Sequence, residues 1–484
     1  MGIVIVGLGP GDGQLLTREA WALLSGANEI WVRTVRHPAV DDLPEAVTIQ
    51  SFDHLYDSAE SFELVYETIV NRVLEMGRTG DVIYAVPGHP FVGEVTVLGI
   101  SAVALEEALE LRIVSGLSFF EPMVTAVGLD GMDGVQIFDA LEVAEQDYPQ
   151  VSGDRPLILG QVYNRLMASE LKLTLTAIYP DEHDVVLVHG AGNGDELIEE
   201  VKLYEIDHSE STSHLTSLYV PPLPEKSDMA ALAEAIATLR GPDGCPWDQK
   251  QTPQSMRDGF LEEVCEVLDA LDRDDVAGVE EELGDVLLHV VMQTQMAAEV
   301  GDFTLSDVIS GIYAKVVRRH PHVWGNVEAA DADEVVVNWE AIKAAEKRDT
   351  VPDTSAMANI QRSLPALARS QKIQKRAAKA GFDWDDIQGV YDKLQEEIAE
   401  LQAAQTASEV QAELGDILFT AVNLAKWLDV DAEIALRESN LKFVRRFREV
   451  ERLALEQGLQ LKEQSEKVLL DLWFEAKAST AGQE

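Results

Sequence analysis

The spacing of apolar and polar residues divides the chain into two parts. Up to about residue 222, short apolar runs rich in β-branched residues alternate with segments of helical periodicity such as Leu15–Ser25 and Phe62–Met76, which is typical of an α/β domain. The runs that predict strands are Ile3–Val6, Val82–Val86, Arg112–Val114, Pro156–Leu159 and Val185–Val188. Beyond the proline-rich stretch Tyr219–Pro224 the strand signals stop, and long segments with apolar residues at helical spacing predict an all-α region.

The helical part contains an internal repeat. Three sequence blocks recur in the same order and at a nearly constant separation, which indicates a tandem duplication. The paired blocks are Glu262–Glu266 with Glu396–Glu400, Glu282–Asp285 with Glu413–Asp416, and Lys315–Arg319 with Lys442–Arg446. We therefore predict three domains, at residues 1–222, 227–345 and 359–484, with a polar linker from Glu346 to Ala358 between the two copies.

Each copy carries two pairs of acidic residues at helical spacing. Residues three apart lie on one face of a helix, so two such pairs on antiparallel helices can converge. The predicted metal ligands are Glu397, Glu400, Glu413 and Asp416 in the second copy and Glu263, Glu266, Glu282 and Asp285 in the first. Converging carboxylates repel one another unless cations lie between them, and Mg²⁺ is the hard cation that such oxygen ligands favour. The alternative, a solvated helix face, does not explain why both pairs recur at matched spacing.

Basic and aromatic residues after the second copy's acids have the spacing of a phosphate-binding face. Lys442 and Arg446 are one helical turn apart, and so are Trp473 and Lys477. Such cations can hold the phosphates that metal ions leave uncovered. Trp473 has two interpretations: it stacks on a nucleotide base, or it is a core or interface aromatic of an apolar C-terminal helix.

A glycine-rich loop follows the first predicted strand and precedes an amphipathic helix. Its residues are Gly7, Gly9, Pro10, Gly11 and Asp12. A strand, glycine loop and helix in this order favour ligand binding, because missing side chains let the backbone approach a cofactor. Asp12 stands where a dinucleotide fingerprint needs Gly or Ala, which argues against a nicotinamide or flavin site. A plain structural turn is the alternative.

Composition narrows the possible partners. The 86 acidic residues outnumber the 38 basic ones, so the formal charge is −48 and the surface repels nucleic acid polymers and anionic membranes. A small polyanionic substrate is still compatible if metal ions and a few basic residues reverse the field locally. The two cysteines, Cys245 and Cys265, form neither a disulfide framework nor a zinc motif, and no segment has the length of a membrane span. We therefore expect a soluble cytoplasmic protein.

Further motifs around the acids resemble the MazG family. They are Cys245–Asp248 (CPWD), Arg319–Val323 (RHPHV), Gln371–Arg376 (QKIQKR) and Gly381–Trp384 (GFDW), and the resemblance covers residues 227–477. MazG proteins are tandem all-α enzymes that use Mg²⁺ to cleave nucleoside triphosphates into a monophosphate and pyrophosphate, and the resemblance implies the same reaction here. It also implies metal ligation by the acidic pairs. The nucleotide-binding residues that it implies are Lys442, Arg446, Trp473, Lys477 and Asn440.

The resemblance also assigns roles to the two copies. The family implies that the second copy is catalytic, and the chemistry of water attack on phosphorus calls for a base, for which Glu396 and Glu397 are the candidates. The first copy keeps its acids but has Tyr313 at the position equivalent to Asn440, so we expect it to be a metal-capable structural partner. The apolar faces of short helical repeats, together with the family, imply a homodimer.

The N-terminal part resembles the tetrapyrrole (corrin/porphyrin) methylases. The motifs are Gly7–Asp12, Tyr84–Pro90 and Ser115–Ser118. These enzymes are two-lobed α/β proteins that bind S-adenosylmethionine between their lobes, which implies that cofactor here. The implied cofactor-binding residues are Gly7, Gly9, Pro10, Gly11, Asp12, Gly88, His89, Pro90 and Ser118. His89 replaces the Asp of a common Gly-Asp-Pro loop, which argues against a tetrapyrrole substrate. A hydrogen-bonded structural histidine is the alternative role for His89.

A methylase-like domain joined to tandem MazG domains resembles the YabN-type fusions. We expect a Mg²⁺-dependent nucleoside triphosphate pyrophosphohydrolase joined to a methyltransferase domain that uses S-adenosylmethionine. One alternative is a methyltransferase whose helical part only senses nucleotides, and another is an inactive scaffold. The intact acidic pairs favour the hydrolase, because a decayed site is expected to lose carboxylates that repel one another.

Overall fold

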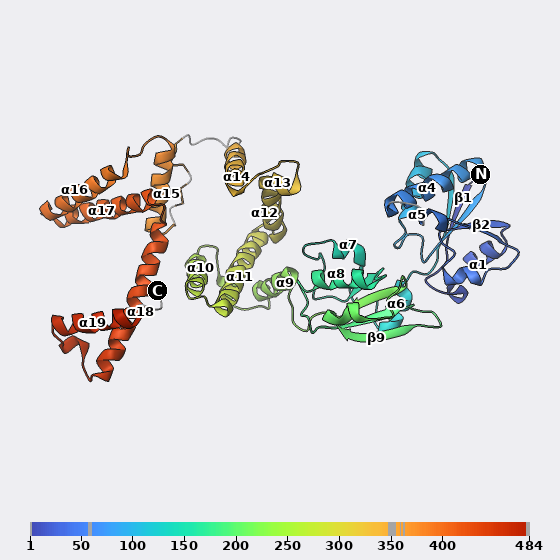
Figure 1. Ribbon diagram of the computed structural model, residues 1–484, viewed down its shortest axis with the longest axis horizontal. Coiled ribbons are helices and arrows are strands. Elements are labelled where there is room, and N and C mark those ends of the chain that lie inside the picture. Colours follow the sequence, from blue (N-terminus) through green and yellow to red (C-terminus); the bar gives the residue numbers. More distant parts are fainter. Residues whose placement is uncertain (1, 57–60, 347–354, 359, 362–363, 481–484) are drawn as a thin grey trace. The chain divides into compact units, whose positions relative to one another are not determined.

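The computed structural model describes residues 2–56, 61–346, 355–358, 360–361 and 364–480, which form two compact units. The first unit spans residues 1–251 and the second spans residues 252–484. Every strand among the described residues lies in the first unit, and the second unit is helical (Figure 1). The predicted fold class, an α/β part followed by an all-α part, is therefore confirmed. Most of the predicted linker, at residues 347–354, lies outside the described residues.

The N-terminal lobe is built on a parallel sheet with the strand order β3-β2-β4-β1-β5. Its strands are β1 (Gly2–Gly7), β2 (Glu29–Val32), β3 (Thr48–Ser51), β4 (Val82–Val86) and β5 (Glu110–Val114). Its helices are α1 (Arg18–Ser25), α2 (Pro38–Asp41), α3 (Asp53–Tyr56), α4 (Phe62–Thr79) and α5 (Val95–Glu106). Helices cover both faces of such a sheet, which explains the continuous apolar run of β1. Ile3 and Ile5 pack with Ile69 of α4, and Val6 packs with Leu24 of α1.

The second lobe has a mixed sheet with the strand order β6-β7-β10-β8-β9. Its strands are β6 (Gln136–Asp139), β7 (Leu157–Gly160), β8 (Asp184–His189), β9 (Leu197–Lys202) and β10 (Thr216–Val220). Its helices are α6 (Phe120–Val127), α7 (Ala140–Ala144) and α8 (Arg165–Leu175). Leu171 and Leu175 of α8 pack in one core of this lobe, and Met123 of α6 packs in another. The first unit therefore has the two-lobed α/β form that was expected.

The helical region begins with α9 (Met229–Arg240), which belongs to the first compact unit. The helices of the first repeat are α10 (Arg257–Asp272), α11 (Val276–Val300), α12 (Leu305–Arg319), α13 (Pro321–Trp324) and α14 (Ala332–Glu346). The helices of the second repeat are α15 (Ala366–Lys379), α16 (Ile387–Ala403), α17 (Ala407–Trp427), α18 (Ala432–Glu456) and α19 (Glu466–Thr480). In each repeat two successive helices pack as a hairpin, α10 on α11 and α16 on α17 (Figure 1). The proposed three-domain boundaries stay a prediction.

The sequence pattern and the structure differ in several short elements. Strands β2, β3, β6, β9 and β10 have no counterpart among the predicted runs; β2, β3 and β6 are only four residues long, and the edge strand β9 contains charged residues. Helix α1 begins at Arg18 rather than at Leu15, because the Thr17 hydroxyl accepts a hydrogen bond from the Ala20 N–H and caps the helix. In the described ranges, no helix combines the length and apolar character that crossing a membrane requires.

Candidate functional site

The acid cluster of the second repeat lies between α16 and α17. Glu397 is buried, Glu413 is half-buried and Asp416 is exposed, and one carboxylate oxygen of each lies within 4.8 Å of the other two. Glu400, the fourth predicted ligand, is exposed and lies outside this group of three, although its charge acts on Glu413. The helix hairpin thus brings together three of the four predicted ligands.

Capping residues set where the two helices of this hairpin begin. Thr406 and Glu409 form a capping box on α17: the Thr406 hydroxyl accepts from the Glu409 N–H at 3.2 Å, and the Glu409 carboxylate accepts from the Thr406 N–H at 3.0 Å. Asp386 caps α16 by accepting from the Gly389 N–H at 3.2 Å. These caps define the starts of the two helices, on which the acidic pairs lie at fixed spacing.

The surroundings of Glu413 disturb its ionisation. Partial desolvation, and then the charges of Glu400 and Glu397, raise the pKa of Glu413 above its ordinary value. Lys393, one turn before Glu397 on α16, opposes this repulsion because its Nζ lies 2.9 Å from carboxylate oxygens of both Glu396 and Glu397. Hydrogen bonds to these two carboxylates raise the pKa of Lys393, so it stays a cation. One ammonium group compensates only part of the negative charge.

The first repeat forms a similar cluster between α10 and α11. Glu263, Glu266 and Glu282 each place a carboxylate oxygen within 4.8 Å of the other two. Asp285, the fourth predicted ligand, lies outside this group. Desolvation raises the pKa of Glu263, and the charges of Asp285 and Glu266 raise it further. The pKa of Glu282 is also raised, by desolvation and then by Glu266. The two groups share two equivalent positions, Glu263 with Glu397 and Glu282 with Glu413, and differ in the third acid.

The predicted nucleotide-binding residues lie on α18 and α19. Asn440, Lys442 and Lys477 are exposed, and Arg446 is half-buried. Within the part of the chain that the structure describes, neither Lys442 nor Lys477 forms an ion pair with the acid cluster of α16 and α17. These two lysines therefore do not neutralise the acids in the part of the chain that the structure describes.

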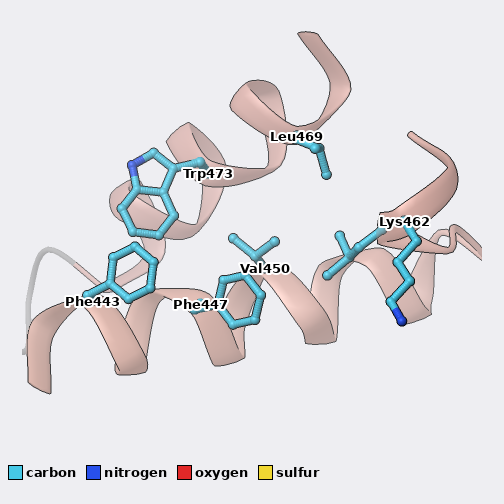
Figure 2. Close-up of a pocket in the computed structure, with 7 residues that line it drawn as sticks. Phe443, Phe447, Val450, Lys462, Leu469 and Trp473 are labelled. Atoms are coloured by element: carbon cyan, nitrogen blue, oxygen red, sulfur yellow. The ribbon is translucent and has the colours of Figure 1, made fainter. Parts of the chain in front are cut away.

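Trp473 borders an apolar pocket of about 350 Å³ between α18 and α19. The pocket is lined by Phe443, Phe447, Val450, Leu461, Lys462, Leu469 and Trp473. The ring of Trp473 lies above Phe443 with 5.3 Å between the ring centroids, and Lys462 lies at the other end of the pocket (Figure 2). Trp473 thus packs as a partly buried aromatic while also bordering open space, so its stacking on a base stays a prediction.

Three glycine loops meet at the carboxyl edge of the parallel sheet. Gly7 ends β1, Gly88 follows β4 and Gly116 follows β5. Gly9 and Gly88 exchange backbone hydrogen bonds of 3.2 and 2.7 Å. A Cβ atom on Gly7 would lie 2.6 Å from backbone atoms of both Gly88 and Gly116, so a residue with a side chain does not fit there. This edge is where open parallel sheets bind their ligands.

The first of these loops also contacts the second lobe. The Asp12 N–H donates to the Asn193 side chain at 3.1 Å, and Gly11 lies so close to Asn193 that a side chain would collide with it. The Asp12 carboxylate accepts from the Gln14 N–H and caps a short 3₁₀ helix. Pro10 is half-buried in the same loop. The predicted loop residues therefore stabilise the conformation of the turn. Their contact with a cofactor stays a prediction.

The other two predicted cofactor loops also have internal contacts. His89 Nδ1 accepts from the Phe91 N–H at 3.1 Å, which is the structural role that was its alternative, and Pro90 is buried. Ser118 is buried, and its hydroxyl donates to the Glu121 carboxylate at 2.6 Å. These contacts neither require nor exclude a bound cofactor.

His37 supports the first glycine loop and was not predicted from the sequence. Its imidazole is buried, its Nδ1 accepts from the Ala39 N–H at 3.3 Å, and the ring also hydrogen-bonds the backbone of Gly9. Burial lowers the pKa of His37 to about 4. The side chain therefore joins the loop to α2 in its neutral form.

Comparisons with known proteins match both parts of the chain. The model of the tetrapyrrole (corrin/porphyrin) methylases matches residues 2–207, and that of the MazG nucleotide pyrophosphohydrolase domain matches residues 251–324. The chain is 40% identical to the uncharacterized protein YabN of Bacillus subtilis (strain 168), over 98% of each chain. The chain belongs to the MazG family, as a YabN-type fusion with a tetrapyrrole methylase domain.

Two relatives of the MazG part carry the name of an activity. The chain is 45% identical to the nucleoside triphosphate pyrophosphohydrolase of Escherichia coli (strain K12), over 51% of this chain and 95% of that protein. It is 42% identical to the nucleoside triphosphate pyrophosphohydrolase/pyrophosphatase MazG of Thermotoga maritima, over 51% of this chain and 94% of that protein. The resemblance inferred from the motifs is confirmed.

Sequence reasoning missed two nitrogen groups beside the MazG acid clusters. Lys393 precedes Glu397 by four residues, a helical spacing that could have been recognised. His289 follows Asp285 by four residues on α11, but it stands within an apolar run where a histidine gives little signal.

Proposed function

We propose that the second MazG repeat hydrolyses nucleoside triphosphates to a monophosphate and pyrophosphate with Mg²⁺. The observation that carries the proposal is the grouping of Glu397, Glu413 and Asp416, whose carboxylate oxygens lie within 4.8 Å of one another. Oxygen ligands so close together fit Mg²⁺, because a divalent cation offsets the repulsion that adds to desolvation in raising the pKa of Glu413. The relatives named as nucleoside triphosphate pyrophosphohydrolases support the substrate class.

The acids of the second repeat divide into ligands and a base. Glu397, Glu400, Glu413 and Asp416 would hold the metal, which when bound neutralises phosphate oxygens and lowers the pKa of a bound water. Glu396 is exposed whereas Glu397 is buried. A proton-accepting role for Glu396 therefore leaves Glu397 free to ligate the ion.

The cations of α18 and α19 complete the substrate site in this proposal. Lys442 and Arg446, one turn apart, and Lys477 would bind phosphates, Asn440 would add a polar contact, and Trp473 would stack on the base. Because neither Lys442 nor Lys477 is ion-paired with the acid cluster among the described residues, a bound triphosphate would bridge the two groups, within one chain or across a dimer.

Exposed apolar side chains support the predicted homodimer. The helices of the second repeat expose large side chains that include Ile398, Leu414, Leu418, Phe443 and Phe447. Apolar side chains exposed in such number on neighbouring helices are typical of an interface between chains. We expect light scattering coupled to size-exclusion chromatography to give twice the mass of one chain, and a strictly monomeric mass would contradict the dimer.

Matched variants in the two repeats test the hydrolase proposal. Glu397→Gln removes a ligand of the second cluster and should lower pyrophosphate release by at least ~100-fold, since even outer-shell partners of a metal site cost up to about that much. Glu263→Gln, at the equivalent position of the first repeat, should leave most of the activity. The measurement is Mg²⁺-dependent pyrophosphate release from common and damaged nucleoside triphosphates. Loss of activity in Glu263→Gln but not in Glu397→Gln would reverse the assignment.

We propose also that the N-terminal domain binds S-adenosylmethionine at the three glycine loops. The support is the approach of the Gly7, Gly88 and Gly116 backbones at the carboxyl edge of the parallel sheet, together with the methylase family match. Isothermal titration calorimetry should detect S-adenosylmethionine binding in the wild type. A Gly88→Val variant, strained because Gly88 has a φ of +63°, should bind less tightly. Absence of binding to the wild type would remove the proposal.

A further inference from the structure

Two arginines at the end of α12, in the first repeat, bind a carboxylate of their own chain. Arg319 donates from Nη2 to Oε2 of Glu346 at 2.6 Å, and Arg318 donates from Nη2 to Oε1 at 2.6 Å. The Nε atoms also donate to Oε1, at 3.3 Å from Arg319 and 2.8 Å from Arg318. Glu346 is the last residue of α14, which packs on α12. Two guanidinium groups from one helix thus bind one carboxylate from the next.

This ion pair is partly shielded from water. The side chains of Arg319 and Glu346 are 16% and 22% exposed, whereas ion pairs between fully exposed side chains contribute little to stability. Hydrogen bonds from Arg319 and then from Arg318 lower the pKa of Glu346 to about 2, so the carboxylate is ionised at neutral pH. Arginine binds carboxylates and phosphates with the same fork of N–H groups. Glu346 therefore supplies the charge and the oxygen atoms that a bound phosphate would supply.

The aromatic ring beside these arginines is also in contact with cations. The guanidinium carbon of Arg319 lies 5.5 Å from the centre of the Trp339 ring, and the ammonium nitrogen of Lys343 lies 4.4 Å from it. Both distances are typical of cation–π contacts. Trp339 and Lys343 lie one turn apart on α14, the helix that ends at Glu346. Helices α12 and α14 thus gather arginines, a lysine and an indole on one face.

The second repeat has counterparts of this face. Trp339 and Lys343 stand four residues apart on the last helix of their repeat, as Trp473 and Lys477 do on α19. Likewise, Arg319 is the counterpart of Arg446 in the repeated block. These three residues of the second repeat belong to its proposed nucleotide-binding set. The ligand class inferred for the first repeat therefore rests on that proposed function.

The two repeats differ at the position of Glu346. Glu346 stands three residues after Lys343, and Thr480 stands three residues after Lys477. Thr480 is buried, and its hydroxyl donates to the Ala476 carbonyl of its own helix at 2.8 Å. A threonine has no charge with which to neutralise a guanidinium group. At this position, therefore, the first repeat has an acid and the second repeat does not.

We propose that Arg318, Arg319, Trp339 and Lys343 form a nucleotide-binding face in the first repeat, which Glu346 closes by taking the place of a phosphate. A nucleoside triphosphate then has to compete with a carboxylate on the adjacent helix. Because that carboxylate belongs to the same chain, its effective concentration is on the order of millimolar or higher. The first repeat is thus a nucleotide site that its own chain keeps closed.

Calorimetric titration of the full chain with Mg²⁺ and α,β-methylene-ATP, which is not cleaved between its α and β phosphates, counts the nucleotide sites. Glu346→Gln should bind one more nucleotide per chain than the wild type. Glu340→Gln is the matched control, because it removes one charge and an ion pair with Lys379 from the same helix, and it should bind the same number as the wild type. The gain of one site is expected whether the wild type binds at the second repeat or not, so failure of the hydrolase proposal is seen separately.

Two further variants locate the added site and keep the test independent of folding. Arg319→Gln, made together with Glu346→Gln, should raise the Kd of the added site by at least ~10-fold, the effect of about one charge-assisted hydrogen bond. If circular dichroism shows that Glu346→Gln loses helix, Glu346→Asp takes its place, because its shorter side chain keeps the charge but reaches the arginines less well. An unchanged number of sites, an equal gain in Glu340→Gln, or an added site that Arg319→Gln does not weaken would overturn the proposal.

Discussion

The buried side chain of His37, beside the first glycine loop, makes the stability of the folded protein depend on pH. His37 is neutral in the folded protein, with a pKa lowered from 6.5 to about 4, mainly by burial. Between these two values the unfolded chain binds a proton that the folded chain does not, so the free energy of unfolding falls as the pH drops from 6.5 towards 4. The loss amounts to about 3 kcal/mol and levels off below pH 4.

The matched variants for this prediction are His37→Gln and His89→Gln. Thermal unfolding of the α/β unit, followed between pH 7 and 4, should show a smaller pH dependence in His37→Gln than in the wild type. His89→Gln, which removes a half-buried histidine of a neighbouring loop, is the control. The same pH dependence in His37→Gln and the wild type would contradict this role of His37.

The sequence pattern identified the acidic residues, but it did not identify the buried histidines. Glu397, Glu413 and Asp416 could be paired because helical spacing and a duplication both pointed to them, and the structure groups these three. Which of the predicted side chains touch a metal or a nucleotide stays a prediction. His37 and His289 gave no signal, because a buried histidine is recognised by its neighbours in space, and those neighbours are distant in the sequence.

The helix that carries Glu413 and Asp416 depends on its N-terminal cap. Replacing Thr406 by Ala removes the hydroxyl that accepts from the Glu409 N–H and breaks the capping box of α17. We expect the free energy of unfolding of the helical unit to fall by about 1 kcal/mol. Ser408→Ala, on an exposed residue two positions further along the same helix, should change it much less. Equal effects of the two variants in urea denaturation would argue against the cap.

Long elements were more predictable than short ones. The run that predicted β4 (Val82–Val86) has the bounds of the observed strand, and the helical pattern from Phe62 corresponds to α4. Strand β2 has only four residues, one of them charged, and gains its place by pairing with β3 and β4. Such strands form because neighbouring strands offer hydrogen-bond partners, which a local pattern does not contain.

The fusion of two families in one chain predicts separate responses to two ligands. Mg²⁺ should raise the unfolding temperature of the helical unit, and S-adenosylmethionine should raise that of the α/β unit. At 100 times its Kd, each ligand adds about 2.7 kcal/mol to the free energy of unfolding of its unit. Differential scanning calorimetry of the full chain measures both transitions. Glu397→Gln should weaken the response to Mg²⁺ and leave the response to S-adenosylmethionine unchanged. One shared transition that moves equally with either ligand would contradict independent units.

The domain organisation could be inferred from the sequence because two kinds of periodicity and an internal repeat mark it. Where the compact units divide was harder to infer, since α9 has a helical sequence but belongs to the unit that ends at residue 251. A helix is assigned to a unit by its packing, and packing is not encoded in periodicity.

The two repeats carry a nitrogen group beside their acids on opposite helices of the hairpin, Lys393 on α16 and His289 on α11. Gly259 stands at the position equivalent to Lys393, and Thr420 at the position equivalent to His289. A crossover that joins the helix of Gly259 to the helix of Thr420 leaves the acids with neither nitrogen group. The reciprocal product joins Lys393 to His289, and the lysine side chain then starts where Gly259 leaves room for the imidazole ring. We therefore expect either chimeric hairpin to be less stable than the two native hairpins.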